Sequence, residues 1–268
     1  MNYNLIFIDA DNTLLDDRHT VPPENIAAIR RASEAGVGVV ICSGRSSVNI
    51  LGFIGELGLD PDKGYFIAFN GCLICGTNGG IIRRAALDKR TALGILGIIK
   101  ESGLTAIAYH DPTYTVTEAE TPYAALYYEA TRLPHKVVGS FADALADETP
   151  KVLALGGRPD LERLAAKASA LSSGGFNVFF SAENLLEFTA PGATKGAAML
   201  YLAEILGIPR CRTAAIGDNQ NDISMIESAG LGVAVANALG EVKAAAKVVT
   251  ARDNNHGAVA EFIDNYVL

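Results

Sequence analysis

Short, wholly apolar runs recur along this chain of 268 residues, and segments with helical periodicity separate them. The first run, residues 5–8, reads Leu-Ile-Phe-Ile, which is typical of a strand that is buried on both faces. Similar runs follow at residues 37–42 and 65–69, and residues 24–35, between the first two runs, place apolar side chains at helical spacing. Strand, helix and strand in this order predict a parallel α/β sheet.

The same alternation returns near the C-terminus. Helices are predicted at residues 195–206 and 222–229, and a strand is predicted between them at residues 213–216. Both ends of the chain therefore predict a single α/β unit, a doubly wound, parallel, Rossmann-like sheet. The middle of the chain instead predicts paired strands with interleaved helices, which indicates an inserted α+β domain. The predicted domains are residues 1–83 plus 190–268 for the core and residues 84–189 for the insertion.

Composition excludes several classes of protein. The chain is 49% hydrophobic and 19% charged, which is the opposite of a disordered sequence. The net charge of −8 and the absence of a basic tract argue against binding to nucleic acid. No apolar run approaches the length of a membrane span, and the first one is too short for a signal peptide. We therefore expect a cytoplasmic protein with no membrane partner, and the sequence leaves the oligomeric state open.

The four cysteines are too sparse for a disulfide scaffold. Cys72 and Cys75 form a C-x-x-C pair, which redox and zinc sites also use. This pair lies in a predicted strand and turn and lacks two further zinc ligands. We favour two small buried side chains over redox or metal chemistry here.

Two carboxylates follow the first predicted strand. Asp9 and Asp11 are two residues apart, so they face the same side of an extended chain. They follow the carboxyl end of the strand, where open α/β sheets bind ligands. Adjacent carboxylates repel each other unless a cation lies between them, and Mg²⁺ prefers oxygen ligands. The alternative is a solvated, aspartate-rich turn.

Three further polar clusters are expected at the same edge of the sheet. Ser43-Gly44-Arg45 follows the second strand and, as the predicted start of a helix, would bind an anion. The loop 217–222 reads Gly-Asp-Asn-Gln-Asn-Asp, and Lys195 begins a helix. Each cluster alone could be an ordinary helix cap or a surface group. Their common position at one edge favours a phosphate and metal site.

In order along the chain, these clusters resemble the four motifs of the haloacid dehalogenase (HAD) superfamily. Asp9-Ala-Asp-Asn-Thr-Leu-Leu resembles the nucleophile motif, and the clusters at residues 43–45, 195–196 and 217–222 resemble the second, third and fourth motifs. Residues 69–71 (Phe-Asn-Gly) and the C-terminal tail narrow the resemblance to the Cof-type, type IIB phosphatases. The inserted domain would then be a C2B cap that selects the substrate.

The resemblance implies a role for each matching residue. Asp9 would be the nucleophile, and Asp11 would be the general acid and base. Mg²⁺ would bind Asp9, Asp218 and the backbone carbonyl of Asp11, with Asp222 either acting through water or restraining Lys195. The remaining matches would bind the substrate: Ser43, Gly44, Arg45, Asn70, Lys195 and Asn221.

We therefore expect a Mg²⁺-dependent phosphatase that hydrolyses small phosphorylated metabolites, similar to sugar phosphates, through an aspartyl-phosphate. Two alternatives remain open, a phosphomutase on hexose phosphates and a non-catalytic protein that binds metabolites. The chain departs from the family pattern at Asn12 and Ala236, where glycine is usual. Asn tolerates a positive φ, so we expect activity to survive.

Overall fold

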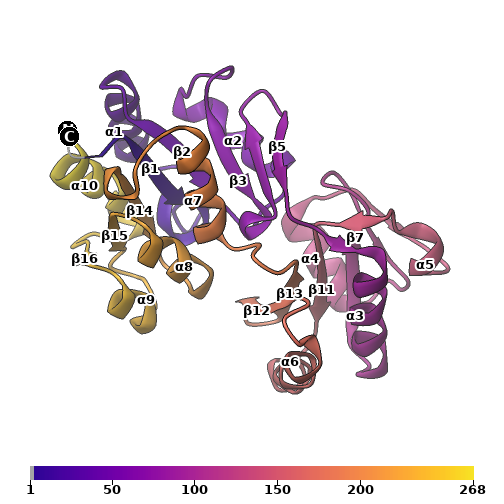
Figure 1. Ribbon diagram of the computed structural model, residues 1–268. Coiled ribbons are helices and arrows are strands. Elements are labelled where there is room, and N and C mark those ends of the chain that lie inside the picture. Colours follow the sequence, from indigo (N-terminus) through magenta and orange to yellow (C-terminus); the bar gives the residue numbers. More distant parts are fainter. Residues whose placement is uncertain (1–2) are drawn as a thin grey trace. The chain divides into compact units, whose positions relative to one another are not determined.

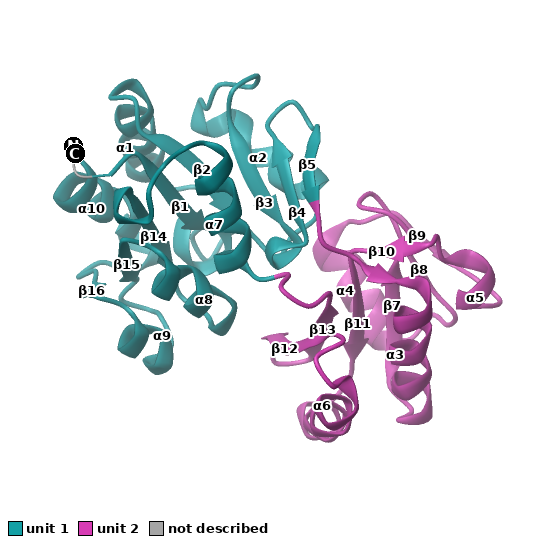
Figure 2. Ribbon diagram, viewed as in Figure 1, with its two compact units in different colours: residues 1–83, 194–268 teal, residues 84–193 magenta. Residues whose placement is uncertain are grey.

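The computed structural model describes residues 3–268, and these residues form two compact units (Figure 2). Unit 1 comprises residues up to Arg83 together with Thr194–Leu268, and unit 2 comprises Arg84–Ala193. Both ends of the chain thus build unit 1. The chain returns to unit 1 at Thr194, a few residues after position 190, where the sequence pattern places this boundary.

Unit 1 contains an eight-stranded sheet in the order β16-β15-β14-β1-β2-β3-β4-β5 (Figure 1). The pairs from β16 through β3 are parallel, and β4 runs antiparallel to β3. The strands are β1 (Leu5–Asp9), β2 (Gly38–Cys42), β3 (Tyr65–Ala68), β4 (Leu73–Gly76), β5 (Ile81–Arg84), β14 (Thr213–Gly217), β15 (Leu231–Ala234) and β16 (Val248–Val249).

Helices cover both faces of this sheet (Figure 1). On one face, α7 contacts β3 and β4, and α8 contacts β14 and β15. There, Leu5 and Phe7 of the central strand belong to an apolar core that also includes Met199 and Leu202 of α7. α1 contacts β2 and packs against α10. The helices are α1 (Pro23–Glu34), α2 (Ser47–Leu57), α7 (Lys195–Ile205), α8 (Gln220–Ser228), α9 (Gly240–Ala245) and α10 (Ala258–Phe262).

Unit 2 contains a six-stranded sheet in the order β12-β13-β11-β7-β8-β9 and a two-stranded one, β10-β6. Its strands are β6 (Leu87–Asp88), β7 (Thr105–Tyr109), β8 (Thr115–Thr117), β9 (His135–Val137), β10 (Glu148–Thr149), β11 (Lys151–Leu155), β12 (Asn177–Ala182) and β13 (Leu185–Thr189). Its helices are α3 (Lys89–Glu101), α4 (Pro122–Thr131), α5 (Phe141–Ala144) and α6 (Arg158–Ser172). α3 packs on β7 and β11, and α6 packs on β12 and β13.

The structure confirms the predicted fold class, a doubly wound parallel sheet with an inserted α+β region. One local prediction is wrong. Ser43 and Gly44 do not open a helix, because α2 begins at Ser47 and Ser46 is its N-cap, accepting a hydrogen bond from the Asn49 N–H. A second serine, three residues further on, takes the capping role, so Ser43 lies in the loop that follows β2.

Within residues 3–268, no helix combines the length and the apolar composition that a membrane span requires.

α7 and α8 approach each other closely at Gly196. A Cβ atom at this position would lie 2.2 Å from the backbone oxygen of Ser224 in α8, so only glycine allows this spacing. The Gly196 N–H also donates to Ser224 Oγ at 3.1 Å. Since Lys195 precedes this contact, the close packing determines where the lysine side chain begins.

We expect G196A to lower the free energy of unfolding by about 1–3 kcal/mol, because the added methyl group forces two backbones apart. The matched control is G52A in α2, where a Cβ would meet no atom within 4 Å. That variant should gain up to about 1 kcal/mol, since alanine is the better helix former. Urea unfolding of both variants measures the difference, and equal stability would contradict the close packing.

Candidate active site

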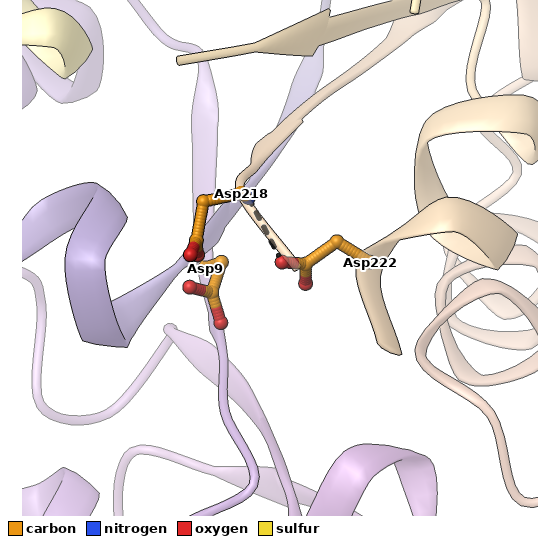
Figure 3. A group of neighbouring side chains, drawn as sticks. All are labelled: Asp9, Asp218 and Asp222. Atoms are coloured by element: carbon orange, nitrogen blue, oxygen red, sulfur yellow. Dashed lines mark hydrogen bonds between the residues drawn. The ribbon is translucent and has the colours of Figure 1, made fainter. Parts of the chain in front are cut away.

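Three carboxylates meet at the carboxyl ends of β1 and β14. Asp9 ends β1, Asp218 directly follows β14, and Asp222 lies in the first turn of α8. Because β1 and β14 are parallel neighbours, with Ile8 opposite Ile216, their ends bring Asp9 and Asp218 together. One oxygen from each carboxylate lies within 4.8 Å of the others (Figure 3), and all three residues are buried.

Lys195 lies among these carboxylates. Its side chain is fully buried, and Nζ donates to Asp222 Oδ1 at 2.6 Å and to Asp9 Oδ1. Thr194 caps α7 by accepting a hydrogen bond from the Ala197 N–H, which fixes the turn from which the lysine extends. Lys195 thus connects Asp9, at the end of β1, to Asp222, in the first turn of α8, although these two aspartates are more than 200 residues apart in the sequence.

The charges of this cluster do not balance. Burial raises the pKa of Asp9 well above its ordinary value, and repulsion from Asp222 adds to this effect while Lys195 opposes it. Burial and the charge of Asp222 also raise the pKa of Asp218, to about 6. Burial alone would lower the pKa of Lys195, but Asp222 and Asp9 outweigh it and raise that pKa. Three carboxylates and one ammonium give the cluster an excess of negative charge, which a divalent cation that prefers oxygen ligands would compensate.

The two oxygens of Asp222 have different partners. Oδ2 accepts hydrogen bonds from the backbone N–H groups of Asp218, at 3.0 Å, and Asn219, at 3.1 Å (Figure 3 shows the first). Oδ1 binds Lys195. Gly217 makes room for this arrangement, since a Cβ there would lie 2.5 Å from the Asp222 carboxyl carbon. Asp222 therefore shapes the loop that presents Asp218 and also holds the lysine.

Asp218 is oriented from the β1 side as well. Thr13 Oγ1 donates to Asp218 Oδ1 at 3.1 Å. The chain reaches Thr13 through a turn at Asn12, whose φ is 56°, the left-handed conformation predicted for this position. The Asn237 side chain donates to the Asn12 carbonyl at 2.8 Å and holds this turn. Asn12 thus adopts the left-handed conformation at a position where the family usually has glycine.

The Asp11 carboxylate lies apart from the buried cluster. It is 41% exposed, and its two oxygens accept from Arg45 Nε at 3.1 and 3.0 Å. Burial disfavours the charge of Arg45, but the hydrogen bonds to Asp11 prevail and raise the arginine pKa. Of the predicted metal-site residues, the carboxylates of Asp9, Asp218 and Asp222 come together, and that of Asp11 pairs with a cation instead.

The remaining predicted residues form a hydrogen-bonded pair of loops beside the cluster. Ser43 is fully buried; its Oγ accepts from the Arg45 N–H at 3.1 Å and its carbonyl accepts from the Asn70 N–H at 3.0 Å. Asn70 Oδ1 accepts from Asn221 Nδ2 at 2.9 Å. Gly44 keeps this contact tight, since a Cβ there would lie 3.1 Å from the Asn70 amide. These loops follow β2 and β3, so they reach the same edge as Asp9.

Sequence patterns assign no site role to Thr13, Asn237 or His19. Thr13 continues the two-residue spacing of Asp9 and Asp11, which is a usable signal. Asn237 has no local signal, because it contacts a backbone group 225 residues away. His19 has no such signal either.

A model of the haloacid dehalogenase-like hydrolases matches residues 6–263. The chain belongs to this family. YxeH of Bacillus subtilis strain 168 is 34% identical over 99% of each chain. The pyridoxal phosphate phosphatase YbhA of Escherichia coli K12 is 29% identical over 100% of each. A crystal structure of a haloacid dehalogenase-like hydrolase from Bacteroides thetaiotaomicron superposes with a TM-score of 0.88, at 28% identity and 98% coverage of both chains.

The substitution K195M should lower the free energy of unfolding in metal-free buffer by about 3–5 kcal/mol at pH 8, because it leaves buried carboxylates without their cation. Since the pKa values of Asp9 and Asp218 are already raised, protonation neutralises these groups as the pH falls. The loss should therefore be smaller at pH 5.

The control is K63M, whose lysine is 84% exposed and should change stability by no more than about 0.5 kcal/mol. Urea unfolding at both pH values measures the effect. A K195M protein as stable as the wild type at pH 8 would show that the ion pairs do not form in solution.

Proposed function

We propose that this protein is a Mg²⁺-dependent phosphatase that hydrolyses small phosphorylated metabolites through an aspartyl-phosphate on Asp9. The observation that supports this most directly is the buried group of three carboxylates around Lys195, at the carboxyl edge of the sheet in a member of a hydrolase family. A relative that is similar along its whole length is named for hydrolysing a phosphate ester, pyridoxal phosphate.

The donor set fits Mg²⁺. The carboxylates of Asp9 and Asp218 and the backbone carbonyl of Asp11 would hold it, with Asp222 behind them. The cluster offers only oxygen ligands and has an excess of negative charge. Bound there, the cation would offset the repulsion between an anionic nucleophile and an anionic phosphoryl group.

The first step would be attack on phosphorus by an oxygen of Asp9, which forms the Asp9 O–P bond while the ester P–O bond breaks. Asp11, in its protonated form, would give its proton to the departing alkoxide. Lys195, the Ser43 hydroxyl and the Gly44 N–H would stabilise the phosphoryl oxygens. The burial of Asp9 beside Lys195 supports its role as the nucleophile, because a desolvated carboxylate with one cationic partner is held at a fixed position.

The second step would release phosphate. Asp11, now ionised, would take a proton from water while the water oxygen attacks phosphorus and the bond to Asp9 breaks. The Asp11 side chain is partly exposed to solvent, which suits a group that exchanges protons in each cycle. Substrate selection by the inserted region, residues 84–189, stays a prediction.

A panel of phosphorylated metabolites, assayed for release of inorganic phosphate with Mg²⁺ present, tests the proposal directly. Hydrolysis of one or more members is the expected result. Conversion of a hexose phosphate to its isomer without phosphate release would instead indicate the phosphomutase. No turnover of any phosphate ester would leave a non-catalytic binding protein.

We expect D9N to reduce the turnover of p-nitrophenyl phosphate by about ten thousand-fold or more, since the amide cannot form the covalent intermediate. The control is D264N on the surface, where Asp264 pairs with Arg31 and is 48% exposed; it should retain full activity. Retained turnover in a folded D9N protein would remove Asp9 as the nucleophile.

Chelation should have two separable effects. EDTA should abolish phosphate release, and added Mg²⁺ should restore it. Mg²⁺ should also raise the thermal midpoint of the wild type in the absence of substrate, because a ligand that binds only the folded state stabilises it. This shift should be lost in D218N, whose cluster has one carboxylate fewer. An unchanged midpoint in the wild type and full activity in EDTA would both contradict a metal site.

A further inference from the structure

The loop between the Asn12 turn and α1 is organised around one buried carboxylate. Asp16 is 6% exposed, and its Oδ1 accepts hydrogen bonds from the Thr20 N–H at 2.9 Å and the Arg18 N–H at 3.0 Å. The Thr20 hydroxyl also donates to Oδ1, at 3.0 Å, and the Arg18 guanidinium donates to Oδ2, at 3.1 Å. So many bonds to one side chain give residues 16–20 a defined conformation.

This conformation presents His19 beside Asp11. The His19 backbone is left-handed, with φ of 59°, and its N–H donates to the Asp16 carbonyl at 2.8 Å. Its Nδ1 lies 4.0 Å from Asp11 Oδ1, and its side chain is 71% exposed. Among residues 3–268, the imidazole has no other ion pair or hydrogen bond. The loop thus fixes the backbone of His19 in an uncommon conformation, and the exposed imidazole lies beside Asp11.

The position of Asp11 determines what His19 can meet. This inference rests on the proposed function, in which Asp11 protonates the oxygen of the leaving group and must lie within hydrogen-bond reach of it. The leaving group therefore lies next to Asp11. Among the residues that the structure describes, two basic side chains lie within 4.0 Å of that carboxylate, Arg45 and His19. Arg45 already donates to both Asp11 oxygens, whereas the imidazole keeps hydrogen-bonding capacity for another partner.

We propose that His19 binds the leaving group of the substrate and favours leaving groups that bear hydroxyls, as in sugar and polyol phosphates. The two ring nitrogens of an imidazole can each form a hydrogen bond, which matches a hydroxyl group that can be donor or acceptor. His19 is then a specificity-determining contact supplied by unit 1 itself.

The variant H19G tests this contact cleanly. Glycine adopts a positive φ without strain, so the loop keeps its conformation while the imidazole is removed. The matched control is H256A, because His256 is also exposed in unit 1 and also lies next to an aspartate, Asp253. Two substrates are compared with Mg²⁺ present: the best substrate from a panel of hexose and polyol phosphates, and p-nitrophenyl phosphate, whose leaving group has no hydroxyl substituent.

We expect H19G to lower kcat/KM about five- to tenfold for the sugar or polyol phosphate, which is the loss of about one hydrogen bond. It should change kcat/KM less than twofold for p-nitrophenyl phosphate, and H256A should change neither. A loss of stability alone would reduce both activities together, so the difference between substrates separates recognition from folding.

Three outcomes overturn the inference: an unchanged H19G, an equal loss on both substrates, or a wild type that cleaves p-nitrophenyl phosphate but no sugar or polyol phosphate. A wild type that cleaves no phosphate ester at all overturns the proposed function itself. The two failures are therefore distinguishable in the wild-type measurements, before any variant is compared.

Discussion

The ion pairs of Lys195 are the interaction on which the site depends. One buried ammonium contacts Asp9 at the end of the central strand and Asp222 at the start of α8. Buried charges are costly unless they are paired and hydrogen-bonded, so this lysine and its two partners restrict one another's positions. The close packing at Gly196 and the loop bonds of Asp222 contribute to the same end, because each limits where a charged group can move.

The site has a buried part and an exposed part with different electrostatics. Around Asp9, burial and like charges shift pKa values upward, and the negative excess suits a cation. Around Asp11, the carboxylate is partly exposed and pairs with Arg45. A phosphoryl group and the alcohol attached to it have correspondingly different needs, one for compensation of charge and the other for a proton. In the proposed mechanism, the two carboxylates, only two residues apart in the sequence, would meet these needs because Asp9 is buried beside Lys195 and Asp11 is partly exposed beside Arg45.

Much of the fold could be predicted from the sequence, because buried parallel strands leave a strong pattern. Apolar runs such as residues 5–8 indicate the sheet, and its carboxyl edge then predicts where Asp9 and Asp218 meet. The start of α2 was predicted wrongly because Ser43 and Ser46 are both able to cap a helix, and only packing decides between them. The Asp11–Arg45 pair and the Asp16-centred loop depend on side-chain geometry, for which periodicity has no signal. The roles of the site residues stay predictions.

The strand order of unit 1 has a consequence for how the chain matures. β1 lies between β2 and β14, and one of these neighbours follows it closely whereas the other begins only at Thr213. During synthesis, all of unit 2 leaves the ribosome while the central strand still has one unpaired edge. The nascent chain must shield that edge from other strands until its last quarter emerges. The order of assembly, and not only the final stability, is therefore a constraint on the sequence of β1.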